Sequence, residues 1–440
     1  MNTLFTDIDY LSKDYEIKHG YVLVEGTSIG YVGPEDPRSR PAFLLNKSDL
    51  QVIPGKARLL TPGFYNIHTH IPMTLLRGYA EGLPLDEWLN TRVFPFEALI
   101  TPEMALPASE LAIAEMLRFG KVGFSDMYNF THERAAAVRT SGIKANLSYG
   151  PVVFDPEQRY EDMPHKAEVE ELVRSYHNTC DGRLKMDIFV HSEYLSNPYV
   201  VEAVGRQAQE LGVNTHIHLS ETVKEHEEAK ERRGGLTPAQ YFDSLGFFAQ
   251  PCTAAHAVWT EPEDWELLAS RGVSVAHNPC SNAKLGSGIA PLKGMLDAGV
   301  NVGLGTDGVA SNNNHNILKE LYAASLLSKA RELDASSITV SQALALATKN
   351  GALSQGRQKA GYLEQGAAAD LVLLDIEGPW MQPSYDLRNN LVFSAQGSDV
   401  CLTMVDGRVL YDQGEWKTID VERAAASVRQ AARDIVAALQ

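Results

Sequence analysis

Short apolar runs alternate with longer amphipathic stretches over residues 60–310. The runs are rich in β-branched residues and bounded by glycine or polar clusters, as strands are, whereas the intervening stretches repeat their apolar positions with a helical period. Eight strands are predicted: the segment ending at His70 and residues 122–128, 144–150, 187–191, 214–220, 253–258, 273–277 and 301–307. Predicted helices cover residues 102–119, 167–177, 200–211, 261–271 and 290–298. Eight strand and helix alternations predict an α/β protein with a (β/α)8 TIM barrel over residues 60–359.

The two ends of the chain predict a smaller unit beside the barrel. Residues 21–26, 29–34, 369–375 and 400–411 have the pattern of short strands separated by turn residues. We expect residues 1–59 and 360–420 to form one small β-sandwich domain. Residues 421–439 are alanine-rich with helical periodicity, so residues 421–440 are predicted to be a C-terminal packing helix.

Charge and composition exclude several classes of partner. The chain has 440 residues and a formal net charge of -17, so nucleic acid and anionic membranes are not expected to bind it. Its apolar residues, 44% of the total, never form an uninterrupted run near the length of a membrane span, and the first seven residues do not resemble a secretion leader. The four cysteines are scattered without C-x-x-C spacing. These features predict a cytoplasmic protein with reduced cysteines.

Two histidines at the end of the first barrel strand have the spacing of metal ligands. His68 and His70 are separated by one residue, and side chains at i and i+2 of a strand project from the same face. Two imidazoles held in this way can bind one metal ion. An H-x-H triplet alone could equally be a polar strand end.

Further polar residues follow at the carboxyl ends of other predicted strands, where barrel enzymes have their catalytic groups. His216 and His218 share one strand face with Glu221 just beyond, and one of these two histidines should ligate. His256 ends the next strand and Asp307 ends the eighth. Each has a simpler alternative, because isolated buried histidines are commonly hydrogen-bonded core residues and glycine-flanked aspartates form ordinary turns.

The motifs around these residues resemble a known family, the amidohydrolase superfamily. They are residues 64–89 (FYNIHTHIPMTLLRGYAEGLPLDEWL), 215–222 (THIHLSET), 254–259 (AAHAVW), 277–292 (HNPCSNAKLGSGIAPL) and 303–314 (GLGTDGVASNNN). Within the superfamily, the chain is similar to the 5-methylthioadenosine/S-adenosylhomocysteine deaminases over nearly its whole length.

The resemblance implies one divalent metal ion per chain, usually zinc. Its ligands would be His68, His70, His218 and Asp307. By the same resemblance, catalysis involves Glu221, His256 and Asp307: water activated by the ion attacks C6 of an adenine ring, Glu221 protonates N1, and a relay through His256 and Asp307 lets ammonia leave. The expected product is the inosine analogue. The expected partner is thus a small-molecule nucleoside, and we also expect a homo-oligomer.

Substrate contacts are also implied by the resemblance. Glu97 corresponds to a carboxylate that accepts hydrogen bonds from the ribose hydroxyls, His191 and Glu221 to groups that bind the base, and Trp88 to an aromatic wall. Read alone, Glu97 would be a surface glutamate and Trp88 a core residue. Arg159 matches an arginine that binds a substrate carboxylate, while Tyr149 stands where some relatives have a second one. Loss of one guanidinium favours 5′-modified adenosines with small neutral tails over S-adenosylhomocysteine.

Two residues have no assigned role at this point. Glu193 adds a carboxylate near the expected base site, where the family often has proline, and His277 could either support the site or be a core histidine.

The same residues exclude one alternative function and leave others open. Residues 191–193 with Pro279 and Cys280 imitate the start of a cytidine-deaminase signature, but position 283 is alanine and not the second cysteine. A deaminase or chlorohydrolase of another heterocycle (guanine, cytosine or a triazine) could use the same metal site. A metal-free scaffold barrel would be expected to have lost ligands, yet all four are present.

Overall fold

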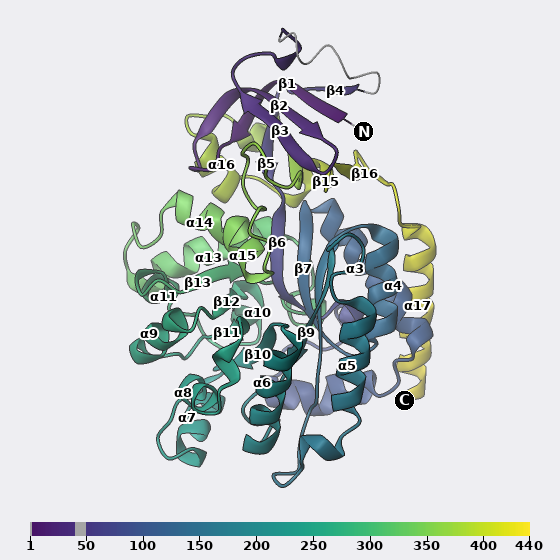
Figure 1. Cartoon of the computed structure of the whole chain (residues 1–440), viewed down its shortest axis with the longest axis vertical. Helices are drawn as coiled ribbons and strands as arrows, with labels where there is room; N and C mark the ends of the chain where they lie inside the picture. Colours follow the sequence, from purple (N-terminus) through teal and green to yellow (C-terminus); the bar gives the residue numbers. More distant parts are fainter. Residues whose placement is uncertain (1, 40–49) are drawn as a thin grey trace.

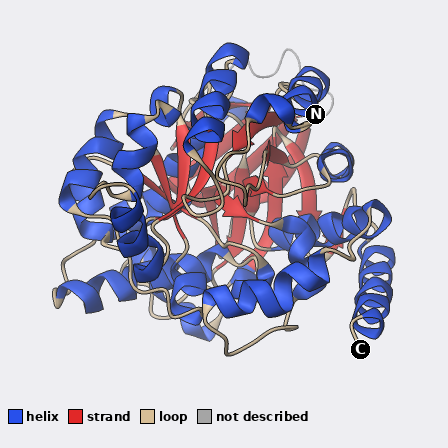
Figure 2. Ribbon diagram, turned by 90° about the horizontal axis from the view of Figure 1, so that it is seen from below, coloured by secondary structure: helices blue, strands red, loops and turns tan. Residues whose placement is uncertain are grey.

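The computed structural model describes residues 2–39 and 50–440, and eight parallel strands form its central barrel. In ring order they are β6 (Phe64–Thr69), β7 (Lys121–Met127), β8 (Lys144–Tyr149), β9 (Leu184–Phe189), β10 (Thr215–Leu219), β11 (Cys252–His256), β12 (Ser274–His277) and β13 (Asn301–Leu304). The amides of Thr306 and Asp307 donate to the carbonyl oxygen of His68 (3.1 and 3.0 Å), which joins the chain after β13 to β6. The predicted (β/α)8 barrel is confirmed, and Figure 2 shows its strands surrounded by helices.

Helices cover the outside of the barrel, so most strand residues are buried on both sides. They are α3 (Pro102–Arg118), α4 (Thr131–Ser141), α5 (His165–Tyr176), α6 (Pro198–Leu211), α7 (Val223–Arg232), α8 (Pro238–Ser244), α9 (Pro262–Ser270), α10 (Pro279–Lys284), α11 (Leu292–Asp297), α12 (Val309–Asn312), α13 (Ile317–Glu332), α14 (Val340–Ala347) and α15 (Lys349–Ser354). The five helices expected from periodicity are confirmed. Their ends follow local signals: Asn197 caps α6 by accepting from the Val200 amide, and Gly212 ends it at a φ of 66°.

Strands from both ends of the chain form the second sheet, at the top of Figure 1. They are β1 (Asn2–Leu11), β2 (Ile17–Glu25), β3 (Ser28–Gly33), β4 (Leu50–Pro54), β5 (Arg58–Pro62), β14 (Leu371–Asp375), β15 (Val400–Val405), β16 (Arg408–Asp412) and β17 (Glu415–Trp416). The sequence predicted a small β-sandwich from both ends of the chain, and in the structure these strands are linked in one mixed sheet that branches at β1. A bulge between Phe5 and Ile8 divides β1, whose first half pairs with β4 and whose second half pairs with β5.

Buried polar contacts connect this sheet to the barrel. Lys144 of β8 donates to Asp370 (2.6 Å), and Tyr65 of β6 donates to the same carboxylate (2.8 Å). The sheet is further joined to the barrel by α16 (Leu387–Phe393), which packs on α13 and α14. The domain limits expected from the sequence stay a prediction.

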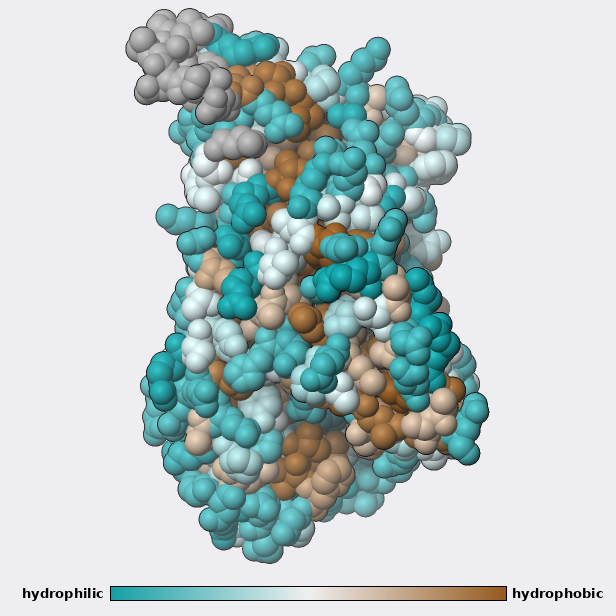
Figure 3. Space-filling model, turned by 90° about the vertical axis from the view of Figure 1, so that its right-hand side faces the viewer, coloured by the Kyte–Doolittle hydropathy of each residue, from teal (hydrophilic) through white to brown (hydrophobic). Residues whose placement is uncertain are grey.

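The last helix, α17 (Val421–Ala438), confirms the predicted C-terminal helix and packs against α3. Both lie at the right of Figure 1. The face that carries α17 is largely hydrophilic, with hydrophobic residues gathered in separate patches (Figure 3). Among the helices of the described ranges, none combines the length and the apolar character needed to cross a membrane.

The chain between β6 and α3 contributes a series of short helices beside the barrel mouth. They are the 3-10 helix η2 (Ile71–Leu76), α1 (Leu85–Trp88), the π-helix η3 (Leu89–Val93) and α2 (Phe94–Glu97). The backbone stays helical from 85 to 97, and the Phe94 amide donates to the Leu89 carbonyl with π-helical spacing. Pro95, which has no amide hydrogen to donate, follows directly. This segment brings Trp88 and Glu97 to the mouth.

Candidate active site

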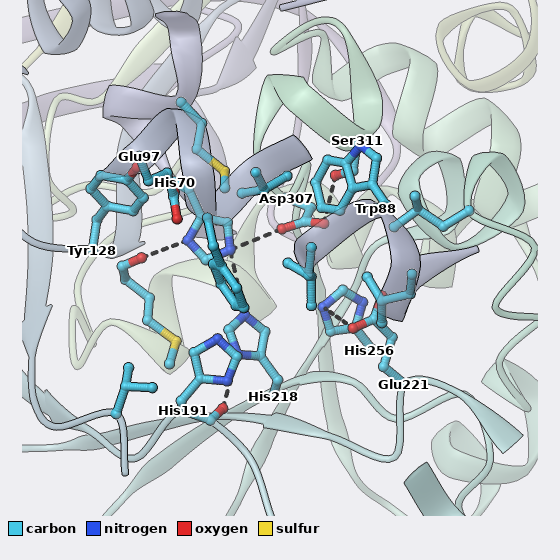
Figure 4. Close-up of a pocket in the computed structure, with 18 of the residues that line it drawn as sticks. His70, Trp88, Glu97, Tyr128, His191, His218, Glu221, His256, Asp307 and Ser311 are labelled. Atoms are coloured by element: carbon cyan, nitrogen blue, oxygen red, sulfur yellow. Dashed lines mark hydrogen bonds and ion pairs between the residues drawn. The ribbon is translucent and has the colours of Figure 1, made fainter. Parts of the chain in front are cut away.

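Five of the predicted residues lie together at the carboxyl ends of the barrel strands. His68 is on β6 and His70 follows it, His218 is on β10, His256 ends β11, and Asp307 follows β13. Figure 4 shows four of them, His70, His218, His256 and Asp307, around one cavity. As expected for residues two apart at a strand end, the side chains of His68 and His70 lie on the same side of the strand.

Each of the three candidate histidine ligands has its Nδ1 occupied by a hydrogen bond. The partners are the carbonyl oxygen of Met127 for His70 (2.5 Å), that of His191 for His218 (2.9 Å), and Nε2 of His216 for His68 (2.9 Å). Each ring consequently presents Nε2 to the same space, and the Nε2 atoms of His70 and His218 are 3.4 Å apart. His216 shares the inner face of β10 with His218, as expected, but lies beside His68.

Asp307 completes this group from the opposite side. Its Oδ1 is 3.1 Å from Nε2 of His70 and 3.4 Å from Nε2 of His68. Its Oδ2 accepts hydrogen bonds from the hydroxyls of Ser281 and Ser311, both at 2.7 Å. One carboxylate oxygen is therefore held by the protein while the other faces the histidines.

These donors suit a divalent cation. Nε2 of His68 is buried and has no hydrogen-bond partner among the described residues. Burial lowers the pKa of His68 to about 3 and that of His218 well below its usual value, so both rings are neutral. Although burial opposes it, the imidazoles of His68 and His70 beside the carboxylate keep the pKa of Asp307 well below its ordinary range. Neutral imidazoles and an ionised carboxylate are the forms that bind metals such as zinc.

His70 differs from the other two histidines in its charge. Burial lowers its pKa, but the hydrogen bond and the charge of Asp307 outweigh this effect and raise the pKa to about 9. A cation bound at these groups would release that proton, because ligating histidines are neutral.

Two further groups face the cavity beside the candidate metal ligands. Nε2 of His256 lies 3.8 Å from Oε2 of Glu221, and its Nδ1 is 2.8 Å from Oδ1 of Asn282. The amide oxygen of Asn282 only accepts, so Nδ1 of His256 donates to it, and Nε2 faces Glu221. Burial raises the pKa of Glu221, which makes its carboxyl group easier to protonate.

A second buried glutamate holds the main chain of Glu221. The carboxylate of Glu225 accepts from the amides of Ser220 (3.1 Å) and Glu221 (2.7 Å). Sequence reasoning missed this residue. The signal was present, because Thr222 followed three residues later by glutamate is the pattern of a helix start, and the Thr222 hydroxyl does accept from the Glu225 amide (3.1 Å).

The cavity brings three predicted substrate contacts besides Glu221 together with the candidate metal ligands. Glu97, Trp88 and His191 all line it. Glu97 is only partly exposed and accepts a hydrogen bond from the hydroxyl of Tyr128, a residue that sequence reasoning did not identify. Burial lowers the pKa of His191 to about 3, so its ring is neutral. The indole of Trp88 is fixed by a hydrogen bond to the Ala80 carbonyl (3.3 Å).

Arg159 and Tyr149 are not brought to this cavity. The guanidinium carbon of Arg159 lies 3.3 Å from the centre of the Tyr199 ring, and Tyr149 donates to Glu168 (2.5 Å). Neither residue lines the cavity. The preference for small neutral 5′ substituents was predicted from Tyr149. Because Tyr149 does not line the cavity, no direct contact supports that prediction.

The two residues left without a role have clear environments. Glu193 is fully buried and bound by Arg232 and Arg233, each at 2.6 Å. It ties the loop after β9 to the end of α7 and does not line the cavity. His277 is buried behind the site, and burial lowers its pKa to about 4, as expected for a neutral core histidine.

Comparison with known proteins agrees with this geometry. The model of the amidohydrolase family matches residues 59–410. A 5-methylthioadenosine/S-adenosylhomocysteine deaminase of Dictyoglomus thermophilum is 42% identical over 385 residues, 88% of this chain and 89% of the relative. A 5′-deoxyadenosine deaminase of Methanosarcina mazei is 38% identical over 96% of this chain and 95% of the relative.

Solved structures agree as well. A zinc-bound adenosine deaminase from Xanthomonas campestris has a TM-score of 0.91 and 30% identity, covering 99% of this chain and 98% of that one. The zinc complex of atrazine chlorohydrolase from Arthrobacter aurescens has a TM-score of 0.88 at 21% identity, covering 98% and 100%, which shows a common fold. With a family match over most of its length and relatives near 40% identity, this chain belongs to the amidohydrolase family.

Proposed function

We propose that the protein is a metal-dependent hydrolytic deaminase of adenosine-type nucleosides. Its substrates would be 5-methylthioadenosine, 5-deoxyadenosine, S-adenosylhomocysteine or adenosine, and its products the inosine analogue and ammonia. The observation that carries the proposal is a cavity lined by His70, His218, Asp307 and the His256 and Glu221 pair, with His68 within ligand distance of these groups. Relatives named as deaminases of these nucleosides support it.

The metal would be held by His68, His70, His218 and Asp307. We propose one divalent ion per chain, zinc, which when bound supplies the Lewis acid that makes water nucleophilic at neutral pH. The unpartnered Nε2 of buried His68 supports this assignment.

Glu221 and His256 would then manage the protons of the reaction. With its raised pKa, Glu221 is suited to take a proton from the attacking water and to deliver one to N1 of the adenine ring. His256 presents Nε2 to the same space and orients the water, while Asn282 fixes its ring. Asp307 can pass a proton onward to the departing amine.

The remaining contacts would orient the nucleoside. We propose that Glu97 accepts hydrogen bonds from the ribose hydroxyls, that neutral His191 binds the base, and that Trp88 forms an aromatic wall. Arg159 is the exception, because it is stacked on Tyr199 and lies away from the cavity.

A substrate panel tests the proposal. Purified protein would be assayed for ammonia release from adenosine, 5-methylthioadenosine, 5-deoxyadenosine, S-adenosylhomocysteine, guanine and cytosine, and for chloride release from atrazine, with and without a chelator. We expect deamination of the nucleosides only, abolished by chelation and restored by zinc. Glu221→Gln should reduce kcat by about 10²–10⁴-fold, the usual contribution of a general acid–base group. Turnover of guanine, cytosine or atrazine alone would refute the substrate assignment.

Self-association, a cytoplasmic location and the identity of the metal stay predictions. Light scattering after gel filtration and metal analysis of purified protein test the first and the last.

A further inference from the structure

A second cavity of about 460 Å³ adjoins the first. Five side chains line both cavities: Leu85, Leu89, Phe94, Tyr194 and Leu285. We call the second space the outer cavity. It lies between the short helices at the mouth, the start of α7 and the chain around residues 285–287. The two cavities are therefore neighbours, with these five side chains at their boundary.

Apolar side chains that remain exposed to water gather in the outer cavity. Phe154 is 76% exposed, Val223 48% and Tyr194 39%. Leu85, Leu89 and Phe94 continue this surface toward the inner cavity. Covering such groups with an apolar ligand removes their surface from water and is favourable.

The charged side chains of the outer cavity already have partners within the protein. Asp86 pairs with Lys224 at 2.6 Å. Arg232 is bound to buried Glu193 at 2.6 Å and to Glu228 at 3.1 Å. Glu225 accepts from two main-chain amides. Among the described residues that line this space, no guanidinium or ammonium is thus left unpaired to receive a ligand carboxylate.

Lys224 is the cation with the most freedom to change partner. Both it and Asp86 are 60% exposed, and exposed pairs of this kind contribute only about 0–1 kcal/mol. Arg232 is less free, since leaving Glu193 would remove one of the two guanidinium groups that bind this buried carboxylate. Any recognition of a carboxylate in the outer cavity would therefore depend on Lys224, which makes the point testable.

We propose that the outer cavity binds the 5′ substituent of the nucleoside and selects extended apolar thioether substituents over those that end in an amino acid. This inference rests on the proposed function and names the substrate class of the same site. Each methylene moved from water into the cavity is expected to raise kcat/KM by about fourfold, the equivalent of 0.8 kcal/mol. A carboxylate tail has to lose hydration without gaining a free cation.

The test compares kcat/KM for adenosine, 5′-methylthioadenosine, 5′-butylthioadenosine and S-adenosylhomocysteine. We expect the butylthio compound to exceed the methylthio compound at least tenfold, and S-adenosylhomocysteine to fall below both. Equal values for the two thioethers, or a preference for S-adenosylhomocysteine, would overturn the inference.

Two variants locate the effect in the outer cavity. Val223→Asp should remove most of the gain from the butyl chain, because the chain would then meet a carboxylate. Val52→Asp is the matched control, since Val52 is 46% exposed but lies on β4 of the second sheet, and it should leave the ratio unchanged. Lys224→Met should raise kcat/KM for the butylthio compound, whereas a tenfold loss confined to S-adenosylhomocysteine would show that Lys224 binds its carboxylate and would overturn the inference.

A binding measurement separates this inference from the proposed function. Calorimetry with 5′-methylthioinosine and 5′-butylthioinosine needs no turnover and should show tighter binding of the butyl compound by at least tenfold. If no nucleoside is deaminated, the proposed function fails, and equal affinities in calorimetry would overturn the inference independently.

Discussion

At the scale of single residues, hydrogen bonds decide which of several similar side chains can act. His216 and His218 have the same residue type and face the same side of β10. His218 is oriented by the His191 carbonyl and has Nε2 in the cavity, whereas Nε2 of His216 is hydrogen-bonded to His68. The two lie at successive depths of the barrel, where side chains stack in layers.

Glu225 provides a test of such positioning. Glu225→Gln replaces one accepting oxygen by an NH2 group, so the amide of Ser220 or Glu221 would face a donor. Leaving one buried group unsatisfied costs about 1–3 kcal/mol, and we expect kcat to fall about 10- to 100-fold with the metal content unchanged. Steady-state kinetics and metal analysis measure both quantities.

The control for this variant is Glu227→Gln, an exposed carboxylate on the same helix. It should retain full activity. If Glu225→Gln were equally active, Glu225 would have no role in placing Glu221.

Lys121 predicts a pH dependence of stability. The side chain is fully buried, its Nζ has no hydrogen-bond partner among the described residues, and burial lowers its pKa to about 7, with Glu115 and Glu320 opposing the shift. Between this value and the ordinary 10.5 the unfolded chain binds more protons than the folded one, so the free energy of unfolding rises with pH across that window. Below pH 7 the buried Lys121 is charged, and it destabilises the folded state by its full amount.

Lys121→Met should therefore stabilise the protein by about 1–4 kcal/mol at pH 6, and the gain should shrink toward pH 10. Urea denaturation at several pH values measures it. Lys18→Met, at an exposed position of β2, should show no such trend. A gain independent of pH would mean that the charge of Lys121 is not responsible.

At the scale of elements, a buried ion pair holds the ends of β6, β7 and β8 in place. Arg134 of α4 donates to Asp126 (2.8 Å) and to the carbonyl of Ser148 (3.1 Å). Asp126 also accepts from the amide of Ile71 (2.6 Å), the residue after His70. The position of a candidate metal ligand thus depends on a helix more than fifty residues away in the sequence.

Arg134→Met should lower the free energy of unfolding by about 3–5 kcal/mol, because it leaves the Asp126 carboxylate buried and unpaired. It should also weaken metal binding through the Ile71 contact. Denaturation curves and metal titration provide the two readouts, with Arg139→Met on the exposed side of α4 as the control. Equal stability of the two variants would argue against this role.

At the scale of the whole molecule, the metal site joins strands that are far apart in the chain. A cation held by residues from β6, β10 and the end of β13 would bind only the folded state. Binding at 1,000 times Kd adds about 4 kcal/mol to the free energy of unfolding. We therefore expect a chelator to lower Tm by several degrees and zinc to restore it.

The same experiment on a His218→Asn variant provides the comparison. This variant should resemble the chelated protein and respond little to zinc. A Tm independent of chelation in the unmodified chain would contradict a bound ion.

Much of this architecture was accessible from local pattern. Short apolar runs predicted the barrel strands, and helical periodicity predicted the flanking helices, because burial imposes these patterns whatever the neighbours are. The same reasoning placed His68, His70, His218, His256 and Asp307 at strand ends. That placement needs only local geometry and the rule that carboxyl ends of parallel strands share one face, whereas the metal ligands and the reaction were implied by the resemblance to the amidohydrolases.

Only the tertiary structure decided what lies between the elements. Arg159 has the right position in sequence but stacks on Tyr199, Glu193 is bound by two arginines of α7, and Glu225 supports Glu221. The branching of the second sheet and the outer cavity are likewise visible only in the tertiary structure. Such contacts depend on loop paths and on side chains brought together from distant parts of the chain, and no short-range periodicity encodes them.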